Sequence, residues 1–130
     1  MSARRLVLRG GGLPEHPQPF PPALRISNLV FSSAMGGYDP ESGELPEDMA
    51  EQVRNAFSHM RTTMELSGGS LDDVAKVTVY LADRDDRSFV NPDWTDTFPD
   101  ENDRPVRHTI VKPLPGGMRI QLEFIGVLAD

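Results

Sequence analysis

Arg107 and Glu123 are the two residues whose types and placement in the last quarter of the chain suit them to chemistry. A guanidinium offers a fork of donors that grips a carboxylate through two hydrogen bonds, and it stays charged at any working pH. A glutamate carboxylate can orient a water molecule or relay its proton. The same pair also suits a simpler structural role, a cross-strand ion pair on a wet sheet face, which contributes about 0.2–1 kcal/mol. The residue types alone leave both interpretations open.

Two runs of alternating residues must position this pair. Residues 104–112 and 118–127 flank the sequence Pro-Leu-Pro-Gly-Gly, which predicts two antiparallel strands joined by a five-residue loop. If Lys112 lies opposite Met118, Arg107 pairs with Glu123, and both side chains share the face of the sheet away from the core. An Arg107 side chain packed against the helices would contradict a site built on this pair.

The surrounding sequence carries a resemblance to a known family. The C-terminal part reads Pro105-Val106-Arg107, then Leu114-Pro115-Gly116 and a strand containing Glu123, and residues 68–83 read GGSLDDVAKVTVYLAD. Together these residues resemble the YjgF/YER057c/UK114 family, also called the RidA or reactive intermediate deaminase family. The resemblance spans residues 19–127. It implies a chorismate-mutase-like fold, assembly as homotrimers, and ligand sites in clefts between neighbouring subunits.

The resemblance also implies roles for individual residues. Arg107 matches the arginine that holds the substrate carboxylate. Phe20 stands where the family has a tyrosine that contributes to the site; its ring either faces a substrate or is ordinary packing. Ser33 and Ala34 match a serine and a glycine that bring the backbone close to the ligand, and Ala34 adds a methyl group there. Asn91 matches a position that is often asparagine in the family, although a role as a helix cap is sufficient to explain it.

The rest of the chain predicts an α+β layer, with two helices on one face of a single sheet, in one domain of residues 1–130. Apolar residues spaced by three and four predict a helix over residues 48–67, and Asn91-Pro92 predicts the start of a second helix. Alternating valines predict a central strand over residues 73–82, and a strand pair over residues 24–34 turns at Ser27-Asn28. Residues 4–9 predict a first strand.

Two further segments bear on a binding site and on assembly. The proline-rich residues 13–22 exclude a helix or a central strand and predict an extended segment that can line a cleft. The sheet face without helices is expected to carry Thr109, Val111 and Ile125 beside Arg107 and Glu123. That mixture is too apolar to stay in water, so we expect the chain to associate through this face.

Composition excludes several classes of protein. The chain has 130 residues, of which 38% are hydrophobic and 25% charged, and it contains no apolar run of membrane length. It has no cysteine, and His16, His59 and His108 are too scattered to form a metal site by spacing, so we expect no metal and no cofactor. The formal net charge of -7 argues against a nucleic-acid surface. We expect a cytoplasmic protein with no membrane contact.

The resemblance implies an enzyme that hydrolyses 2-imino acids, such as 2-iminopropanoate and 2-iminobutanoate, to 2-oxo acids and ammonia. Arg107 would hold the carboxylate, and Glu123 would orient the attacking water. The departures at Phe20 and Ala34 keep open a related deaminase of aromatic degradation, acting on an aminomuconate or hydroxylaminobenzoate type of substrate. A non-catalytic trimer that binds a carboxylate metabolite is a further alternative. An endoribonuclease or translation inhibitor is disfavoured by the net charge.

Overall fold

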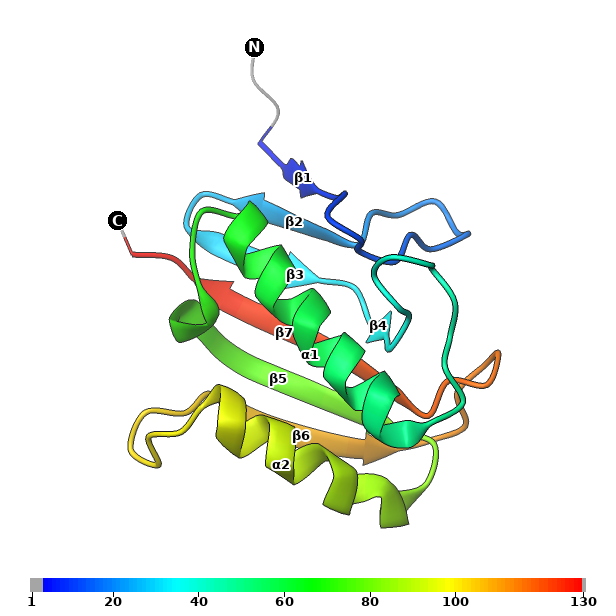
Figure 1. Ribbon diagram of the computed structural model, residues 1–130. Helices are drawn as coiled ribbons and strands as arrows, with labels where there is room; N and C mark the ends of the chain where they lie inside the picture. The colour runs from blue at the N-terminus through cyan, green and yellow to red at the C-terminus, as the bar shows by residue number, and fades with distance from the viewer. Residues whose placement is uncertain (1–3, 130) are drawn as a thin grey trace.

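A computed structural model describes residues 4–129 as one mixed sheet with two helices on one of its faces (Figure 1). Strand β7 (Ile120–Val127) and strand β5 (Val74–Leu81) form the centre, between β3 (Leu29–Ser32) and β6 (Val106–Val111). The sheet continues beyond β3 through β2 (Ala23–Ile26) to β1 (Leu6–Leu8), and the short β4 (Met35–Gly36) pairs with β7. The helices are α1 (Met49–Leu66) and α2 (Arg87–Thr97), and the 3-10 turns Leu71–Asp73 and Arg84–Asp86 precede β5 and α2.

Helix α1 follows the prediction closely, because local signals define both of its ends. The side chain of Asp48 caps the first turn by accepting a hydrogen bond from the Glu51 amide at 3.1 Å. At the other end Gly68 adopts φ +94, which ends the helix in the left-handed conformation that glycine tolerates. The predicted helix over residues 48–67 is therefore confirmed.

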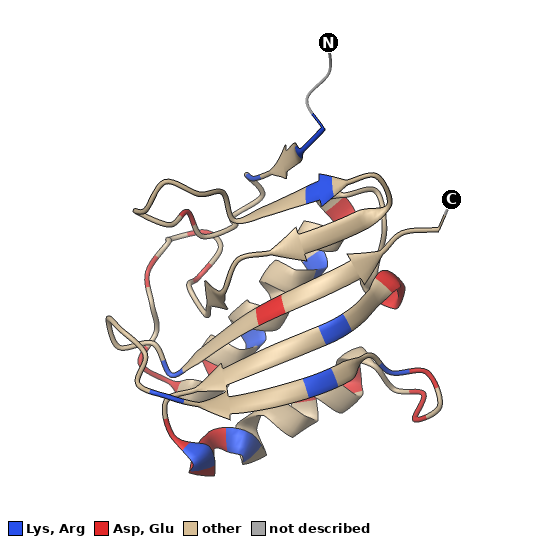
Figure 2. Cartoon of the chain, turned by 180° about the vertical axis from the view of Figure 1, so that it is seen from behind, with Lys and Arg blue, Asp and Glu red and all other residues tan. Residues whose placement is uncertain are grey.

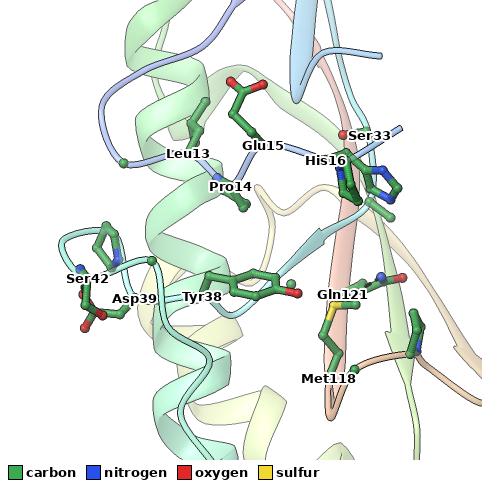
Figure 3. A pocket seen from close by; sticks show the side chains of 18 of the residues that line it. Leu13, Pro14, Glu15, His16, Ser33, Tyr38, Asp39, Ser42, Met118 and Gln121 are labelled. Carbon is green, nitrogen blue, oxygen red and sulfur yellow. Dashed lines mark hydrogen bonds between the residues drawn. The ribbon is translucent and has the colours of Figure 1, made fainter. Parts of the chain in front are cut away.

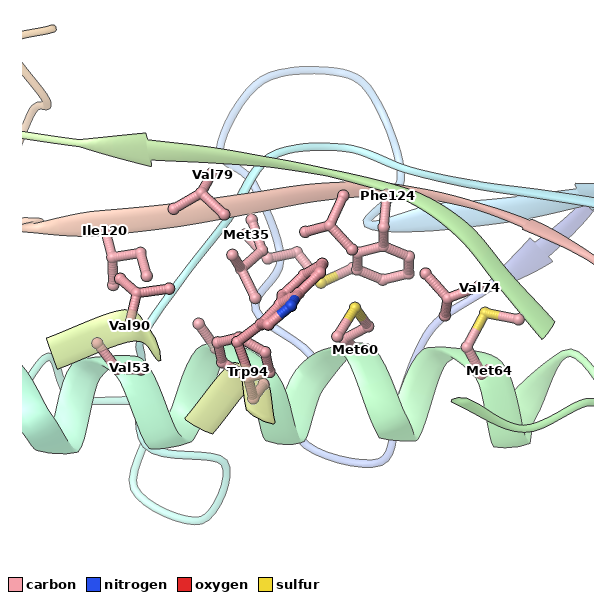
Figure 4. Close-up of a cluster of buried hydrophobic side chains, with 14 of the residues drawn as sticks. Met35, Val53, Met60, Met64, Val74, Val79, Val90, Trp94, Ile120 and Phe124 are labelled. Carbon is pink, nitrogen blue, oxygen red and sulfur yellow. The ribbon is translucent and has the colours of Figure 1, made fainter. Parts of the chain in front are cut away.

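The core lies between the helices and the sheet (Figure 4). Alternate residues of the two central strands point into it and are fully or almost fully buried: Val77, Val79 and Leu81 of β5, and Ile120, Leu122 and Phe124 of β7. Met60 and Met64 of α1 are fully buried and pack against them, so methionine fills the core from this helix. The predicted central strand and the strand pair turning at Ser27, which has φ 54, are also confirmed.

The predicted hairpin of the last two strands is wrong. Strand β5 lies between β6 and β7, pairing in parallel with β6 and antiparallel with β7. The segment β5–α2–β6 is thus a crossover unit, in which a helix joins two parallel neighbouring strands. Both ends of the expected hairpin loop are tied to the end of β5, since the Lys112 amide donates to the Leu81 carbonyl at 3.0 Å and the Ala82 amide to that of Arg119 at 3.2 Å.

This topology changes which face each residue of β6 occupies. Arg107 lies beside Val77, whose side chain is in the core, and Thr109 lies beside Val79. Arg107, Thr109 and Val111 therefore face the helix side, not the open side as expected. Each strand carries few charged residues, and most of the charged residues lie in the loops and helices (Figure 2). The apolar side chains on the open face include those of Phe31 and Ile125, in place of the β6 residues expected there.

The start of α2 was also predicted wrongly. The helix begins at Arg87, and Pro92 lies inside it. Asp83 caps the preceding turn by accepting from the Asp85 amide at 2.9 Å, so the capping signal belongs to an aspartate eight residues before Asn91. Asn91 is consequently free to use its side chain elsewhere. No helix within the described residues 4–129 has the length and apolar character needed to cross a membrane.

Candidate functional site

Arg107 holds an unusual position for a cation. Its Nη1 donates to Oδ1 of Asn91 at 2.9 Å, its Nε donates to Oγ1 of Thr109 at 3.2 Å, and its guanidinium carbon lies 5.2 Å from the ring centroid of Trp94. Partial burial, and then repulsion from Arg87, lower the pKa of Arg107 below its ordinary value. The ion pairs formed within residues 4–129 do not include Arg107. The structure thus holds a half-buried positive charge among neutral partners.

Glu123 lies on the other face of the sheet. It pairs with Thr78 of β5, and its Oε1 accepts a hydrogen bond from the Tyr80 hydroxyl at 2.9 Å. That hydrogen bond is the main cause of a raised pKa for Tyr80. Glu123 lines a small cavity of about 260 Å³ with Phe31, Ser32, Lys76, Thr78, Phe124 and Ile125. The expected meeting of Arg107 and Glu123 within one chain does not occur, because the two side chains lie on opposite faces of the sheet.

A larger cavity of about 650 Å³ lies where the proline-rich segment, the loop after β3 and the loop before β7 come together (Figure 3). Ser33 and Ala34 line this cavity, although the Ser33 hydroxyl is engaged with the Pro22 carbonyl at 2.8 Å. The prediction that residues 13–22 line a cleft is confirmed for residues 13–17. The remaining lining residues are Gly12, Gly36, Tyr38, Asp39, Pro40, Glu41, Ser42, Gly43, Pro115, Gly116, Met118 and Gln121.

The loop that carries Tyr38 is fixed by side chains of α1. His59 bonds through Nε2 to the Tyr38 carbonyl at 2.7 Å, and Nδ2 of Asn55 donates to the Gly37 carbonyl at 3.1 Å. The backbone at Gly37 approaches α1 so closely that a Cβ there would lie 2.1 Å from the Gln52 carbonyl oxygen. Burial lowers the pKa of His59, against smaller opposing effects of the Tyr38 carbonyl and Asp39.

Phe20 lies beside the cavity without lining it. Its ring is 43% exposed and stacks on His16, with ring centroids 4.4 Å apart. His16 does line the cavity, and its Nδ1 accepts from the Gln18 amide at 3.0 Å. The described contacts of Phe20 therefore connect it to the cavity through His16.

Sequence reasoning missed Tyr38 and Gln121, the two polar side chains that face each other across the cavity (Figure 3). Gln121 is two residues from Glu123 and shares its side of β7, so the same alternation that selected the glutamate could have selected the glutamine. Tyr38 follows Gly36-Gly37, a signal of close backbone approach. Within residues 4–129 no three His, Asp or Glu side chains gather closely enough to hold a metal ion.

The fold and the cavity together define an α+β protein with a small-molecule-sized recess at one end of its sheet. The family model described as Endoribonuclease L-PSP matches residues 13–128. The chain therefore belongs to this family, the YjgF/RidA family indicated by its C-terminal signature.

Known proteins that match most of this chain, and are matched over most of their own length, support this assignment. A RutC family protein of Pyrococcus abyssi is 33% identical over 109 residues, which cover 82% of this chain and 84% of the relative. The 2-iminobutanoate/2-iminopropanoate deaminase of Escherichia coli is 29% identical over 111 residues, covering 84% and 87%. The crystal structure of RidA from the Antarctic bacterium Psychrobacter matches with a TM-score of 0.86 at 28% identity, covering 94% of this chain and 98% of that chain.

Proposed function

We propose that this protein is an imine deaminase that hydrolyses 2-imino acids to 2-oxo acids and ammonia. Water adds through its oxygen to the carbon of the C=N bond, a proton moves to the nitrogen, and the resulting carbinolamine collapses to the ketone as ammonia leaves. The observation that carries the proposal is the half-buried Arg107 guanidinium, whose partners are all neutral. The name of the Escherichia coli relative is in accord with it.

Arg107 binds the substrate carboxylate in this proposal. Its contacts with Asn91 and Thr109 hold Nε and Nη1, and the guanidinium needs an anion to balance its charge. A carboxylate bound there places the neighbouring imine carbon at a fixed position for attack by water. Asn91 is then a positioning residue for Arg107, a role that replaces the helix cap expected from the sequence.

The substrate site is composed of two chains. The residues that line the large cavity include no Lys or Arg, so the cavity by itself has no strong cation to hold a carboxylate. Arg107 lies on β6, the edge strand at the other end of the sheet path from β1. We therefore propose a homotrimer in which the β6 edge of one chain lies against the cavity of the next. Such a head-to-tail contact closes into a ring under threefold symmetry.

Glu123 remains our prediction for the group that orients the attacking water, and it needs its own test. Its carboxylate is engaged with Tyr80, and the chain's larger cavity presents Gln121 instead. Glu123→Gln keeps the size of the side chain and removes its capacity to accept a proton. A decrease in kcat of roughly 100-fold is the expected result for a general base, and an unchanged kcat would leave Glu123 with a structural role in the pair with Tyr80.

The first experiment couples the protein to an amino-acid dehydratase that generates 2-iminopropanoate or 2-iminobutanoate, and measures ammonia release. Wild type should accelerate release, and Arg107→Ala should lower kcat/KM by roughly 30-fold or more, as expected for loss of one partner of a desolvated charge pair. Arg84→Ala is the matched control, since Arg84 is an exposed arginine in the turn before α2. No acceleration by wild type would refute deamination of these imines.

A complementation experiment tests the two-chain site directly. Arg107→Ala removes the cation, and Ala34→Phe fills the cavity, so each variant alone should be inactive. In mixed trimers a working site needs an intact cavity from one chain and an intact Arg107 from its neighbour. Random mixing at equal amounts gives such sites with a frequency of about one quarter. Activity that fails to return on co-expression, although mass analysis shows mixed trimers, would place Arg107 and the cavity in separate functions.

The same observations favour deamination over RNA cleavage, despite the name of the family model. The net charge is -7, and the cavity is lined by Glu15, Asp39 and Glu41 without Lys or Arg. A phosphodiester backbone would be repelled by such a surface. The dehydratase assay distinguishes an enzyme from a non-catalytic trimer. A trimer that only binds a carboxylate metabolite through Arg107 would not accelerate ammonia release.

A further inference from the structure

We infer that Tyr38 is a substrate-binding residue, and that its cavity selects imino acids with a bulky, uncharged side chain that ends in a hydrogen-bonding group. This inference rests on the proposed deaminase function and specifies its substrate class. It concerns the part of the substrate that lies away from the carboxylate and the C=N bond.

The cavity is too large for the smallest imino acids. In a single chain its volume is about 650 Å³. Cavities of roughly 300–1,000 Å³ hold ligands of drug-like size, whereas the side chains of 2-iminopropanoate and 2-iminobutanoate are only a methyl and an ethyl group. Leu13, Pro14, Pro17, Ala34 and Met118 supply apolar walls that suit a larger hydrocarbon side chain.

The backbone at Tyr38 is held in place by two side chains of α1. Its carbonyl bonds to the buried His59, and the preceding carbonyl accepts from Asn55. Gly36 leaves room for the ring, since a Cβ at that position would lie 3.0 Å from Cε2 of Tyr38 and 2.5 Å from Sδ of Met118. The backbone that carries the phenol is thus held in place before any ligand arrives, which lowers the entropy lost on binding.

The hydroxyl of Tyr38 points across the cavity toward Met118 and Gln121 (Figure 3). The hydrogen bonds formed among residues 4–129 leave this hydroxyl without a protein partner. On the opposite wall the Gln121 amide donates only to the weak acceptor Sδ of Met118, at 3.5 Å. A phenol and a carboxamide with unused hydrogen-bonding capacity therefore face each other over apolar walls, and they match an uncharged polar group on a ligand.

The charge of the lining sets a further limit on the ligand. Glu15, Asp39 and Glu41 contribute carboxylates, and neither Lys nor Arg is among the residues that line the cavity. A second carboxylate on the substrate would be repelled there. The cavity thus disfavours dicarboxylates of the aminomuconate type and favours an uncharged side chain with a terminal polar group, such as hydroxybenzyl.

The experiment compares imines made in place by an L-amino-acid oxidase, with catalase present, from alanine, phenylalanine, tyrosine and glutamate. The expected order of kcat/KM has the tyrosine-derived imine above the alanine-derived and glutamate-derived imines. Tyr38→Phe should lower the ratio of kcat/KM for the tyrosine-derived over the phenylalanine-derived imine by roughly two- to tenfold, the effect of one neutral hydrogen bond. Most of the change should appear in KM, because the hydroxyl lies away from the reacting bond.

Tyr80→Phe is the matched control, since Tyr80 lies outside the cavity and bonds to Glu123; the ratio should stay at its wild-type value. If the alanine-derived imine is turned over but larger imines are not, or if Tyr38→Phe leaves the ratio unchanged, the inference is overturned while the deaminase stands. If no imine is turned over, the proposed function itself fails. Tyr38→Leu provides a second variant, expected to lower kcat/KM for both aromatic imines.

Discussion

Replacement of His59 should remove a specific part of the dependence of stability on pH. His59 is fully buried in α1, its Nε2 bonds to the Tyr38 carbonyl at 2.7 Å, and its Nδ1 has no hydrogen-bond partner. A proton on Nδ1 would place both a charge and an unsatisfied N–H in the core, which is why burial lowers the pKa of this imidazole. The folded protein therefore holds His59 neutral at pH values where the unfolded chain protonates it.

The sign of the effect follows from proton linkage. Because the folded pKa is lower than the unfolded value of 6.5, the unfolded state binds more protons as the pH falls below 6.5. The contribution of His59 to stability is complete above pH 6.5 and is lost as the pH falls toward the folded pKa. The loss approaches about 1.4 kcal/mol per pH unit at 25 °C. Between pH 7.5 and 5.5 the loss from this one group is therefore at most about 1.4 kcal/mol.

The measurement is urea unfolding of wild type and His59→Gln at pH 7.5, 6.5 and 5.5. Glutamine retains an N–H that can reach the Tyr38 carbonyl and does not titrate, so the difference in unfolding free energy should narrow as the pH falls. His108→Gln, which replaces an exposed histidine on β6, should keep the wild-type pH dependence. Parallel curves for wild type and His59→Gln would refute the neutral, buried state assigned to His59.

Two further predictions concern contacts that hold the cavity and the sheet together. Gly37→Ala places a methyl group 2.1 Å from the Gln52 carbonyl oxygen, so the loop must move, with a loss of roughly 1–3 kcal/mol in urea unfolding; an unchanged midpoint would contradict this packing. Arg119→Met leaves the buried Asp86 without its partner at 3.1 Å and should cost about 1.5–3 kcal/mol. Arg9→Met, which removes an exposed pair at 3.6 Å, should cost less than about 1 kcal/mol.

Elements with complete local signals could be predicted from the sequence. Helix α1 has an aspartate cap, a regular apolar stripe and a glycine stop, and the β2–β3 turn lies at Ser27-Asn28 as expected. In each case the residues that determine the structure lie within a few positions of one another. The same holds for β5, whose buried valines mark it as a central strand.

The arrangement of the last three strands depends on competition between partners, which a local pattern does not contain. Residues 106–111 and 120–127 adjoin a short loop, and a hairpin is the simplest way to pair them. Strand β5 alternates buried residues from Val77 to Leu81 and pairs on both edges, so it takes the place between them. The sequence order strand, helix, strand over residues 74–111 was the signal for a parallel crossover, and it outweighs proximity in the chain.

The error in pairing explains why Arg107 and Glu123 were expected on one face of the sheet. The neighbouring strand and the register together determine which face of the sheet each side chain occupies. With β7 as the assumed neighbour, Arg107 was expected beside Glu123, but with β5 as the actual neighbour it lies beside Val77. The residue type was informative, because Arg107 has no acidic partner among residues 4–129, but its position relative to Glu123 was not predicted correctly. Tyr38 was missed because its backbone is positioned by residues distant in sequence, by His59 at its own carbonyl and by Asn55 at the carbonyl of Gly37.

The separation of the cation from the cavity constrains how the protein can work. The cavity supplies apolar walls and neutral polar groups, and Arg107 supplies a positive charge on the edge strand β6, away from the cavity lining. Neither half alone can hold an imino acid at both its carboxylate and its side chain. If the chains assemble head to tail, the carboxylate contact and the side-chain contact belong to different subunits, and activity then depends on assembly. Dilution to concentrations at which the oligomer dissociates should therefore lower the turnover per chain in proportion to the loss of trimer, because the folded monomer is inactive.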